Sequence, residues 1–318
     1  MSARTISEEE EKRLKRIGFL NNRDTDCFSA RVITRNGRMD AEQMHSIADA
    51  ARHFGNGTLI MTARLSVEVQ GIPYEKIEPF REYLNAHGLE TGGTGAKVRP
   101  IVSCKGSTCH YGLLDAYSLA EELHNAFFVG YHDVVLPHKF KIAVGGCPNN
   151  CVKPTLNDLG IMGQRIPDYR PEKCLNCNDC GVVNTCPTRA ARIKNHHLEI
   201  NKDKCVQCGR CITKCHFDVM NGHTDGYTIF IGGRWGKKQA SGRPLNQFFT
   251  DKNEVIKTVE KTILFFREQG LPGERFATTI NRIGYPVAEA QILSDKILER
   301  KDEILAIDCD EAMNLVRC

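Results

Sequence analysis

The sequence predicts an α+β fold in which a small α/β domain precedes a larger α+β domain, and a cysteine-rich domain interrupts the larger one. Three observations predict this division. Helix and strand patterns alternate over the first 90 residues, twelve of the 15 cysteines fall in two dense groups, and strand and helix patterns resume after the second group. The expected boundaries are 1–90 for the small domain, 91–166 with 227–318 for the larger domain, and 167–226 for the insertion.

The composition favours a globular protein with metal or redox chemistry. The formal net charge of +4 does not favour a nucleic-acid or membrane-surface protein. No apolar run approaches the ~18–20 residues of a membrane span, and the charged N-terminal segment lacks the apolar stretch of a signal peptide. We therefore expect a cytoplasmic protein. Structural disulfides are rare in that compartment, so the 15 cysteines call for another explanation.

The small domain begins with a helix and a strand. The first ~20 residues are charged and predict a helix, and residues 28–35 read as a strand. Asp40, with Gln43 three residues later, predicts a capping box for a helix that ends at Phe54. On this helix Met44 is expected on the apolar face.

Strand and helix patterns then continue along the chain. Residues 58–70 alternate between apolar and polar side chains and read as one strand, with Arg64 on its polar face. A helix follows over about 74–87 and ends at Gly88. The remaining predicted elements are strands at about 100–103 and 139–144, and helices at about 116–125, 253–268 and 287–305.

Eight cysteines of the insertion have the spacing of a bacterial two-cluster ferredoxin. In the run C-x2-C-x2-C-x3-C, three close thiolates hold one [4Fe–4S] cluster and the fourth ligates the other cluster. The first run of the insertion has a longer last gap. Zinc sites share the C-x2-C spacing. However, the eight cysteines form two sets, each with three closely spaced cysteines and one distant cysteine, and this pattern fits cubane clusters better. We therefore assign one cluster to Cys174, Cys177, Cys180 and Cys215, and the other to Cys186, Cys205, Cys208 and Cys211.

The other dense group consists of Cys104-x4-Cys109 and Cys147-x3-Cys151. Alone, these pairs fit zinc or one further iron–sulfur cluster. The segments TARLSVEVQGIPYEKI and LPHKFKIAVGGCPNNCVKPTLNDLGIMGQ resemble the nitrite/sulfite reductase family, whose members hold a sirohaem bridged to a [4Fe–4S] cluster. The CPNNC loop matches closely, whereas the x4 gap is one residue shorter than the family's x5. With its cysteine-rich insertion, the chain looks most like the catalytic C subunit of the anaerobic sulfite reductases.

The resemblance implies a fold and a set of cofactors. It implies the sirohaem sulfite/nitrite reductase fold, with a ferredoxin-like small domain and an inserted 2[4Fe–4S] ferredoxin domain. Cys104, Cys109, Cys147 and Cys151 would hold a cluster that Cys151 bridges to the sirohaem iron, so that the chain binds one sirohaem and three [4Fe–4S] clusters. Sirohaem carries many carboxylates, and Arg suits them best. The expected donors to it are Arg64, Asn149, Arg234, Lys237 and Lys238.

The resemblance also implies an anion-binding site. Lys139 and Lys141 are one residue apart, so on a strand they point to the same face. In the family such a pair binds the substrate, and two arginines assist it, which Arg31 and Arg99 match. Arg35 takes the place of Arg31 if the strand register differs. For any single Lys or Arg the alternative is an ordinary solvated surface charge.

The implied reaction is the six-electron reduction of sulfite to sulfide, with electrons passing from the ferredoxin-type clusters through the sirohaem-coupled cluster. Three alternatives remain: nitrite reduction to ammonia at the same site, an electron-transfer subunit without sirohaem, and a zinc-stabilised module. No dinucleotide-binding motif follows a strand, so we expect electrons from a donor subunit or a soluble ferredoxin. Family members carry two copies of the sirohaem half and this chain carries one. We therefore expect a homodimer or a hetero-oligomer whose active site is shared between chains.

Overall fold

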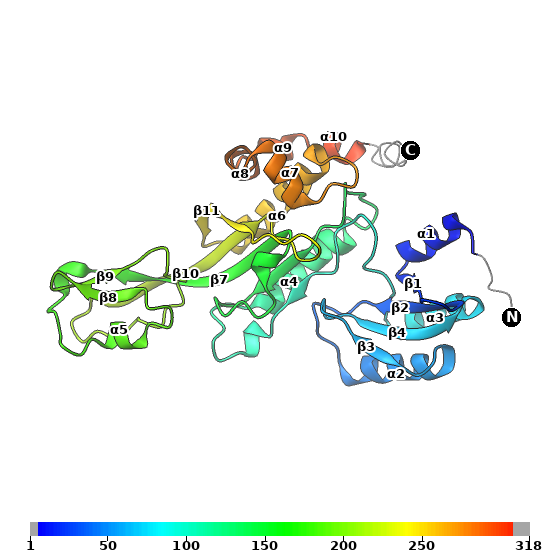
Figure 1. Cartoon of the computed structure of the whole chain (residues 1–318), viewed down its shortest axis with the longest axis horizontal. Coiled ribbons are helices and arrows are strands. Elements are labelled where there is room, and N and C mark those ends of the chain that lie inside the picture. The colour runs from blue at the N-terminus through cyan, green and yellow to red at the C-terminus, as the bar shows by residue number, and fades with distance from the viewer. Residues whose placement is uncertain (1–5, 308–318) are drawn as a thin grey trace. The chain divides into compact units, whose positions relative to one another are not determined.

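The computed structural model describes residues 6–307, which form two compact units (Figure 1). The first unit contains the described residues up to Ser103, residues 120–143, and the described residues from Val259 onward. The second unit contains residues 104–119 and 144–258. This division reflects how the residues pack. It does not test the domain boundaries predicted from the sequence, which stay a prediction. Cys309 and Cys318 lie outside the described residues.

An antiparallel sheet with strand order β1-β2-β4-β3 forms the N-terminal half of the first unit. Helices α2 (Ala41–Phe54) and α3 (Ile77–Ala86) pack on each other, and α2 also packs on β4. The predicted alternation of helix and strand is therefore confirmed for this half. The strands are β1 (Phe19–Asn21), β2 (Cys27–Val32), β3 (Leu59–Met61) and β4 (Val67–Pro73).

Helix α2 begins as its sequence predicts. The Gln43 backbone N–H donates to the Asp40 carboxylate at 2.7 Å, and the Asp40 N–H donates to the Gln43 side chain at 3.2 Å. This capping box satisfies two N–H groups that the first turn leaves without helical partners. The buried face is formed by Ile47, Ala50 and Ala51, whereas Met44, predicted to lie on that face, is exposed.

The single strand predicted over residues 58–70 is wrong, because β3 and β4 form a hairpin. The Thr62 N–H donates to the Ser66 carbonyl at 2.9 Å, and the two hydroxyls hydrogen-bond at 2.7 Å. Leu65 has a positive φ of 60°, a conformation that a continuous strand does not contain. Arg64 therefore lies in the turn and not on the polar face of a strand. Alternation of side chains does not distinguish these two arrangements.

The N-terminal half has a large apolar core. Fifteen buried residues form it, and Phe80 packs edge-to-face on Phe19 and on Phe54 with ring centroids 6.0 Å apart in both pairs. Burying this much apolar surface is sufficient to hold a small sheet and its helices together.

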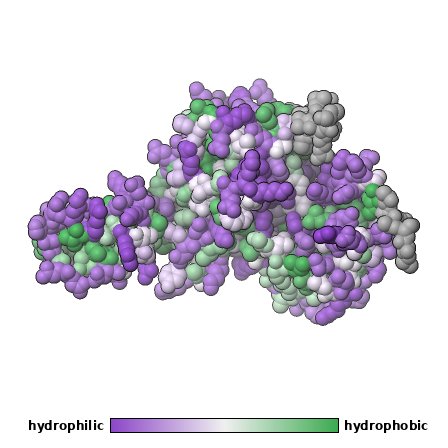
Figure 2. Space-filling model, in the orientation of Figure 1, coloured by the Kyte–Doolittle hydropathy of each residue, from purple (hydrophilic) through white to green (hydrophobic). Residues whose placement is uncertain are grey.

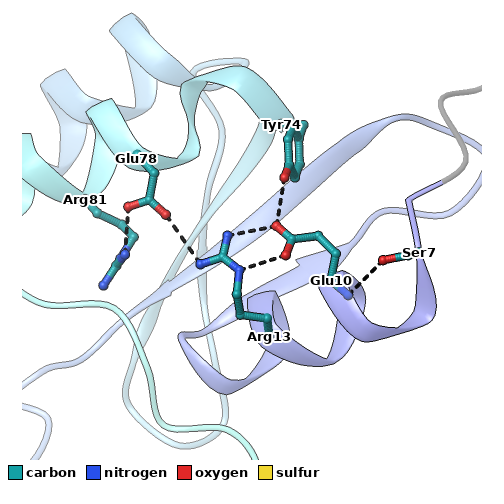
Figure 3. Close-up of polar contacts among 6 residues, drawn as sticks. All are labelled: Ser7, Glu10, Arg13, Tyr74, Glu78 and Arg81. Atoms are coloured by element: carbon teal, nitrogen blue, oxygen red, sulfur yellow. Dashed lines mark hydrogen bonds and ion pairs between the residues drawn. The ribbon is translucent and has the colours of Figure 1, made fainter.

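Polar contacts attach α1 (Glu8–Arg16) to this half (Figure 3). The Glu10 carboxylate accepts two hydrogen bonds from Arg13 and one from the Tyr74 hydroxyl, each of 2.8 Å. Arg13 also approaches Glu78 of α3 at 3.7 Å. The hydrogen bonds from Arg13, and then that from Tyr74, lower the pKa of Glu10 from 4.5 to about 2.

The C-terminal part of the described chain is helical and is more divided than predicted. Helix α6 spans Lys252–Gln269, close to the expected 253–268. The single helix predicted over 287–305 is wrong, because Ser294 and Arg300 adopt non-helical angles at the ends of successive helices. An unpredicted helix also precedes them. The helices are α7 (Phe276–Ile283), α8 (Tyr285–Leu293), α9 (Lys296–Glu299) and α10 (Lys301–Ala306).

Two long strands form the framework of the second unit. Strands β7 (Leu159–Tyr169) and β10 (Met220–Ile231) pair in antiparallel register from Leu159 opposite Ile231 to Tyr169 opposite Met220. The whole sheet has the order β11-β10-β7-β6-β5, and the division between the units falls within β6. Strand β11 (Arg243–Phe249) belongs to the second unit and β5 (Val102–Ser103) to the first, whereas residues of β6 (Ile142–Gly145) and α4 (Ala116–Leu123) fall in both. Helix α4 continues into a π-helical turn, His124–Val129, of the first unit.

Residues 170–219 form an insertion between β7 and β10 (Figure 1). It contains α5 (Gly181–Thr185) and a hairpin of β8 (Ala191–Lys194) and β9 (His197–Ile200). The chain also has short 3-10 turns at Tyr74–Lys76, Gly106–Thr108, Pro154–Leu156 and Pro171–Lys173. Among the helices of residues 6–307, none has both the length and the apolar character needed to cross a membrane.

Candidate functional site

Two loops of the second unit bring four cysteines together. Cys104 and Cys109 flank the turn after β5, and Cys147 and Cys151 lie on the loop after β6. The Gly146 N–H donates to the Cys104 sulfur at 3.2 Å. A Cβ atom at Gly106 would lie only 3.1 Å from the Gly146 Cα. The two loops therefore approach so closely that glycine is needed where they meet.

The packing of the two loops places the four cysteines in one region of the second unit. Burial raises the pKa of the Cys147 thiol, and the charges of Cys104, Cys151 and Cys109 raise it further, whereas a backbone hydrogen bond from Asn149 lowers it. Among the described residues, no three Cys, His, Asp or Glu side chains are close enough to share one metal ion. A cubane cluster makes no such demand, because each thiolate binds a different iron at one corner. We call Cys104, Cys109, Cys147 and Cys151 the inner set.

The loop between Cys147 and Cys151 also contains a hydrogen-bond acceptor that was not predicted from the sequence. The Asn150 Oδ1 atom is buried without a hydrogen-bond partner, while the Nδ2 atom donates to the Thr155 hydroxyl at 3.4 Å. Asn150 has a positive φ of 57°, which asparagine tolerates better than most residues. The predicted donor Asn149 is exposed. The pair of asparagines in CPNNC was the available signal, but it did not distinguish the two.

A second group of thiols gathers around Cys211 in the insertion. Burial raises the pKa of Cys211 to about 11, and the charges of Cys205, Cys208 and Cys186 add to the effect. Burial alone would also raise the pKa of Cys186, but hydrogen bonds from backbone N–H groups and the Thr188 hydroxyl lower it. These four cysteines, here called the middle set, are those that the sequence assigns to one cluster.

The remaining cysteines of the insertion, Cys174, Cys177, Cys180 and Cys215, form the outer set. Cys174 accepts a hydrogen bond from the Leu198 N–H at 3.2 Å, and Cys215 from the Phe217 N–H at 3.4 Å. A Cβ at Gly181, next to Cys180, would lie 2.5 Å from the Lys214 carbonyl oxygen. The segments that carry Cys180 and Cys215 are therefore in close contact, as one shared cluster requires.

Strand β7 contacts, in succession, residues that lie beside each of the three cysteine sets. Next to the inner set, a Cβ at Gly163 would lie 2.7 Å from the Gly146 carbonyl oxygen. In the loop of the middle set, the Gln207 carbonyl accepts from the Arg165 N–H at 2.8 Å. Beside the outer set, the Tyr169 hydroxyl donates to the Leu198 carbonyl. Because a strand rises ~3.3 Å per residue, the three sets follow one another along the strand.

The predicted anion-binding arginines lie in the first unit around Gly93. The Arg99 guanidinium donates to the Gly93 carbonyl, and a Cβ at Gly93 would lie 3.9 Å from the Arg31 Cδ atom. Arg31 lies opposite Glu68 in the sheet and forms an ion pair with it at 3.0 Å. Its Nε atom is buried without a hydrogen-bond partner. The contact of Arg31 with Glu68 was not predicted, because the register of β2 with β4 is not visible in the sequence.

The remaining predicted cations of the first unit lie near the same segment. Arg64, from the β3–β4 turn, donates to the Pro100 carbonyl at 2.9 Å. The Arg99 N–H donates to the Phe140 carbonyl at 2.8 Å. Phe140 is fully buried between the half-buried Lys139 and Lys141. The two lysines lie just before β6, and their alternation with Phe140 is that of extended chain. We call Arg31, Arg99, Lys139 and Lys141, the residues predicted to bind the anion, the cationic group.

The predicted basic turn of the second unit follows β10. Arg234 pairs with Ala240 across the turn, and Lys237 and Lys238 are exposed. A Cβ at Gly233 would lie 2.3 Å from the Thr155 carbonyl oxygen. The turn therefore packs on the segment that directly follows the loop of Cys147 and Cys151.

Two family models match the chain. The nitrite and sulphite reductase 4Fe-4S domain matches residues 94–298, and the nitrite/sulfite reductase ferredoxin-like half domain matches residues 21–87. The chain belongs to the nitrite and sulfite reductase family. Members of this family bind [4Fe–4S] clusters and sirohaem. The family resemblance predicted from the sequence is thereby confirmed.

Several curated relatives are sulfite reductases. A coenzyme F420-dependent sulfite reductase of Methanocaldococcus jannaschii is 31% identical over 272 residues, which are 84% of this chain and 42% of that protein. The alpha subunit of a dissimilatory-type sulfite reductase of Allochromatium vinosum is 27% identical and covers 76% of this chain and 63% of that subunit. The C subunit of the anaerobic sulfite reductase of Salmonella typhimurium is 28% identical over 45% of either chain. The chain thus spans less than two thirds of these relatives.

Two solved structures share the fold. Dissimilatory sulfite reductase I superposes with a TM-score of 0.65 at 22% identity and covers 84% of this chain and 69% of that chain. The NirA protein of Mycobacterium tuberculosis gives 0.63 at 15% identity and covers 92% and 48%. At these identities the likeness establishes the fold alone. The sirohaem nitrite/sulfite reductase fold and its ferredoxin-like half domain are confirmed, whereas the clusters of the insertion stay a prediction.

Proposed function

We propose that this chain is the sirohaem-binding subunit of a sulfite reductase and that it reduces sulfite to sulfide. The observation that carries the proposal is the inner set, whose four cysteines lie on two closely packed loops joined by the hydrogen bond from the Gly146 N–H to the Cys104 sulfur. The curated relatives named as sulfite reductases support sulfite as the substrate. Nitrite is the competing substrate, because it too is a small oxyanion that takes up six electrons.

The residues of the second unit fit the two cofactors that the family binds. Four neighbouring thiols are the donors that a [4Fe–4S] cluster requires, and Cys151, the exposed member of the inner set, is the proposed bridge to sirohaem. Asn149, Arg234, Lys237 and Lys238 are the proposed contacts of this unit to the sirohaem carboxylates, with Arg64 from the first unit. When bound, the two cofactors supply electrons to the sulfur atom of sulfite at one iron.

The cationic group is the proposed anion site. Sulfite is a dianion over part of the physiological pH range, and its oxygens leave as water. Side chains that attract the anion and polarise its S–O bonds therefore accelerate the reaction. Arg31 suits this role because Glu68 fixes its guanidinium while the buried Nε atom lacks a partner. A buried donor without a partner is unfavourable, and an anion at this point would satisfy it.

The insertion is proposed to be a 2[4Fe–4S] ferredoxin domain whose clusters occupy the outer and middle sets. The order of the three sets along β7 supports an electron path from outer to middle to inner set. With one sirohaem half per chain, we further propose that two chains share each active site, the cationic group of one chain facing the cofactors of its mate.

Anaerobic turnover with reduced methyl viologen tests the proposal. Sulfide should be the product, and kcat/KM for sulfite should exceed that for nitrite. Replacing Lys141 with Ala should lower kcat/KM for sulfite by about 10²–10³-fold, as the loss of one electrostatic contact to the reacting group does. Lys12→Ala, which removes an exposed lysine of α1, is the matched control and should leave turnover unchanged. A preference for nitrite would overturn the substrate, and absence of turnover with either anion would overturn the function.

A further inference from the structure

The insertion presents apolar side chains to solvent beside the outer set. Leu175, between Cys174 and Cys177, is 66% exposed, and Phe217, two residues after Cys215, is 43% exposed. Figure 2 shows hydrophobic side chains gathered on this lobe and surrounded by hydrophilic ones. An exposed apolar patch with a polar rim is typical of a protein-binding surface.

We propose that Leu175 and Phe217 form the contact surface for an acidic one-electron carrier protein, which delivers electrons to the cluster of the outer set. The inference rests on the proposed function, because it takes the outer set to hold a cluster. In the transfer the carrier loses one electron and the cluster gains it, and no bond forms or breaks.

The contacts of both side chains support this position. The Phe217 N–H donates to the Cys215 sulfur at 3.4 Å, so the segment that bears the ring directly contacts a proposed cluster ligand. Leu175 is covalently next to Cys174, and Cys177 is itself exposed. A protein that covers Leu175 and Phe217 therefore lies directly beside proposed ligands of the outer cluster.

The loops of the other two cysteine sets are held to the sheet of the second unit or to each other. The loop of the middle set is tied to β7, since the Arg165 N–H donates to the Gln207 carbonyl at 2.8 Å and the Gln164 side chain donates to the Val206 carbonyl at 3.2 Å. The loops of the inner set pack on each other at Gly106 and Gly146. The outer set lies at the end of the series along β7 that is farthest from the inner set, and we expect the carrier protein to dock at this end.

The charge of the insertion indicates the kind of partner. Residues 170–219 contain nine Lys or Arg and five Asp or Glu, a net charge of +4, which equals the net charge of the whole chain. The rest of the chain is therefore neutral, and the excess positive charge is concentrated on this lobe. Such a field accelerates the approach of an acidic protein, more strongly at low salt.

Calorimetric titration of the full chain, purified anaerobically with its clusters, tests the proposal. The probe is an acidic plant-type [2Fe–2S] ferredoxin, titrated at 20 and 300 mM salt. Leu175→Glu should raise Kd about tenfold or more, because it removes apolar contact and adds a charge that repels the probe. The matched control is Leu271→Glu, which makes the same change at a 54% exposed leucine of the first unit and should leave Kd unchanged. Leu175→Ser and Phe217→Ser should have smaller effects of the same sign.

The outcomes separate this proposal from the proposed function. Equal Kd values for Leu175→Glu and Leu271→Glu overturn the docking surface, as does wild-type binding that salt does not weaken. In either case the proposed function is unaffected, because sulfite turnover with reduced methyl viologen does not require a carrier protein. If Leu175→Glu loses iron, the two serine variants decide, and wild-type affinity in both overturns the docking surface. A chain that holds no cluster in the insertion overturns the docking surface together with the electron path.

Discussion

The N-terminal half of the first unit and the insertion of the second unit are held together by different forces. The half formed by β1–β4, α2 and α3 has a core of fifteen buried apolar residues, among them Phe19, Phe28 and Phe80. The insertion packs around a core of only five buried residues, the last of them Met220 at the start of β10, and five of its cysteines pack against this core. One region thus buries much apolar surface, whereas the other is largely built around thiols.

This difference indicates how each region folds. Apolar burial contributes ~25 cal/mol per Å², which is enough for the sheet and helices of the N-terminal half. A region of about 50 residues with so small a core needs further cross-links. Iron–thiolate bonds at the proposed clusters would supply them, because a metal site that forms only in the folded state adds its binding energy to folding.

Removing iron should give the largest effect. Chelation under reducing conditions should unfold the insertion, because its five-residue core cannot hold α5 and the β8–β9 hairpin. Hydrogen exchange read by mass spectrometry should show full exchange over residues 181–200 while residues 67–84 remain protected. Protection of both segments in iron-free protein would contradict the comparison.

Replacing one ligand of the middle set should give a more local loss. Cys211→Ser should remove about four iron atoms per chain, because one of the four thiolates that the cluster needs is lost. Iron and acid-labile sulfide assays measure the effect. Cys27→Ser, at a partly buried cysteine outside the three sets, is the control and should keep the full iron content. Equal iron content in the two variants would remove Cys211 from its assigned cluster.

Truncating a buried side chain of the N-terminal half should have the opposite effect: it should destabilise that half and leave the insertion intact. Phe80→Ala should destabilise the N-terminal half by about 3–5 kcal/mol, since it leaves a cavity where a fully buried ring contacts Phe19 and Phe54. Denaturant unfolding followed by hydrogen exchange should place the loss in residues 19–84. The visible spectrum of the clusters should not change. A bleached spectrum in this variant would show that the two regions depend on each other.

The smallest expected effect is the weakening of the attachment of α1 at low pH. The pKa of Glu10 is about 2 in the folded chain, against an ordinary 4.5. Because it is lowered, the carboxylate stabilises the attachment of α1 above pH ~4.5 and loses this contribution as the pH falls towards 2. Glu10→Gln should weaken protection of α1 amides at pH 6 and make it less dependent on pH down to 3. A variant with the same pH profile as the wild type would contradict this assignment.

Local sequence signals predicted much of the fold. The Asp40–Gln43 box sets the start of α2 by contacts within one turn, and Gly88, with a positive φ of 68°, ends the helix before it. The cysteine spacing likewise relates residues that are near in sequence, and the cluster assignment that it gives stays a prediction. Such features depend on residues that are near in sequence.

Features that depend on distant residues were missed. Arg64 was placed on a strand because alternation continues through the Thr62–Ser66 turn, and only the pairing of β3 with β4 reveals the hairpin. Glu68 meets Arg31 through the register of β2 with β4. The close approach of Gly163 to Gly146 likewise joins residues that the spacing alone does not relate.

Acid extraction of pigment from anaerobically purified chain tests the central claim most directly. The account predicts an isobacteriochlorin spectrum, about one sirohaem per chain, and about twelve further iron atoms in three [4Fe–4S] clusters. A brown iron–sulfur protein from a host that makes sirohaem, with no tetrapyrrole in the extract, would contradict it. The cationic group would then lose its proposed substrate, and the chain would be an electron carrier.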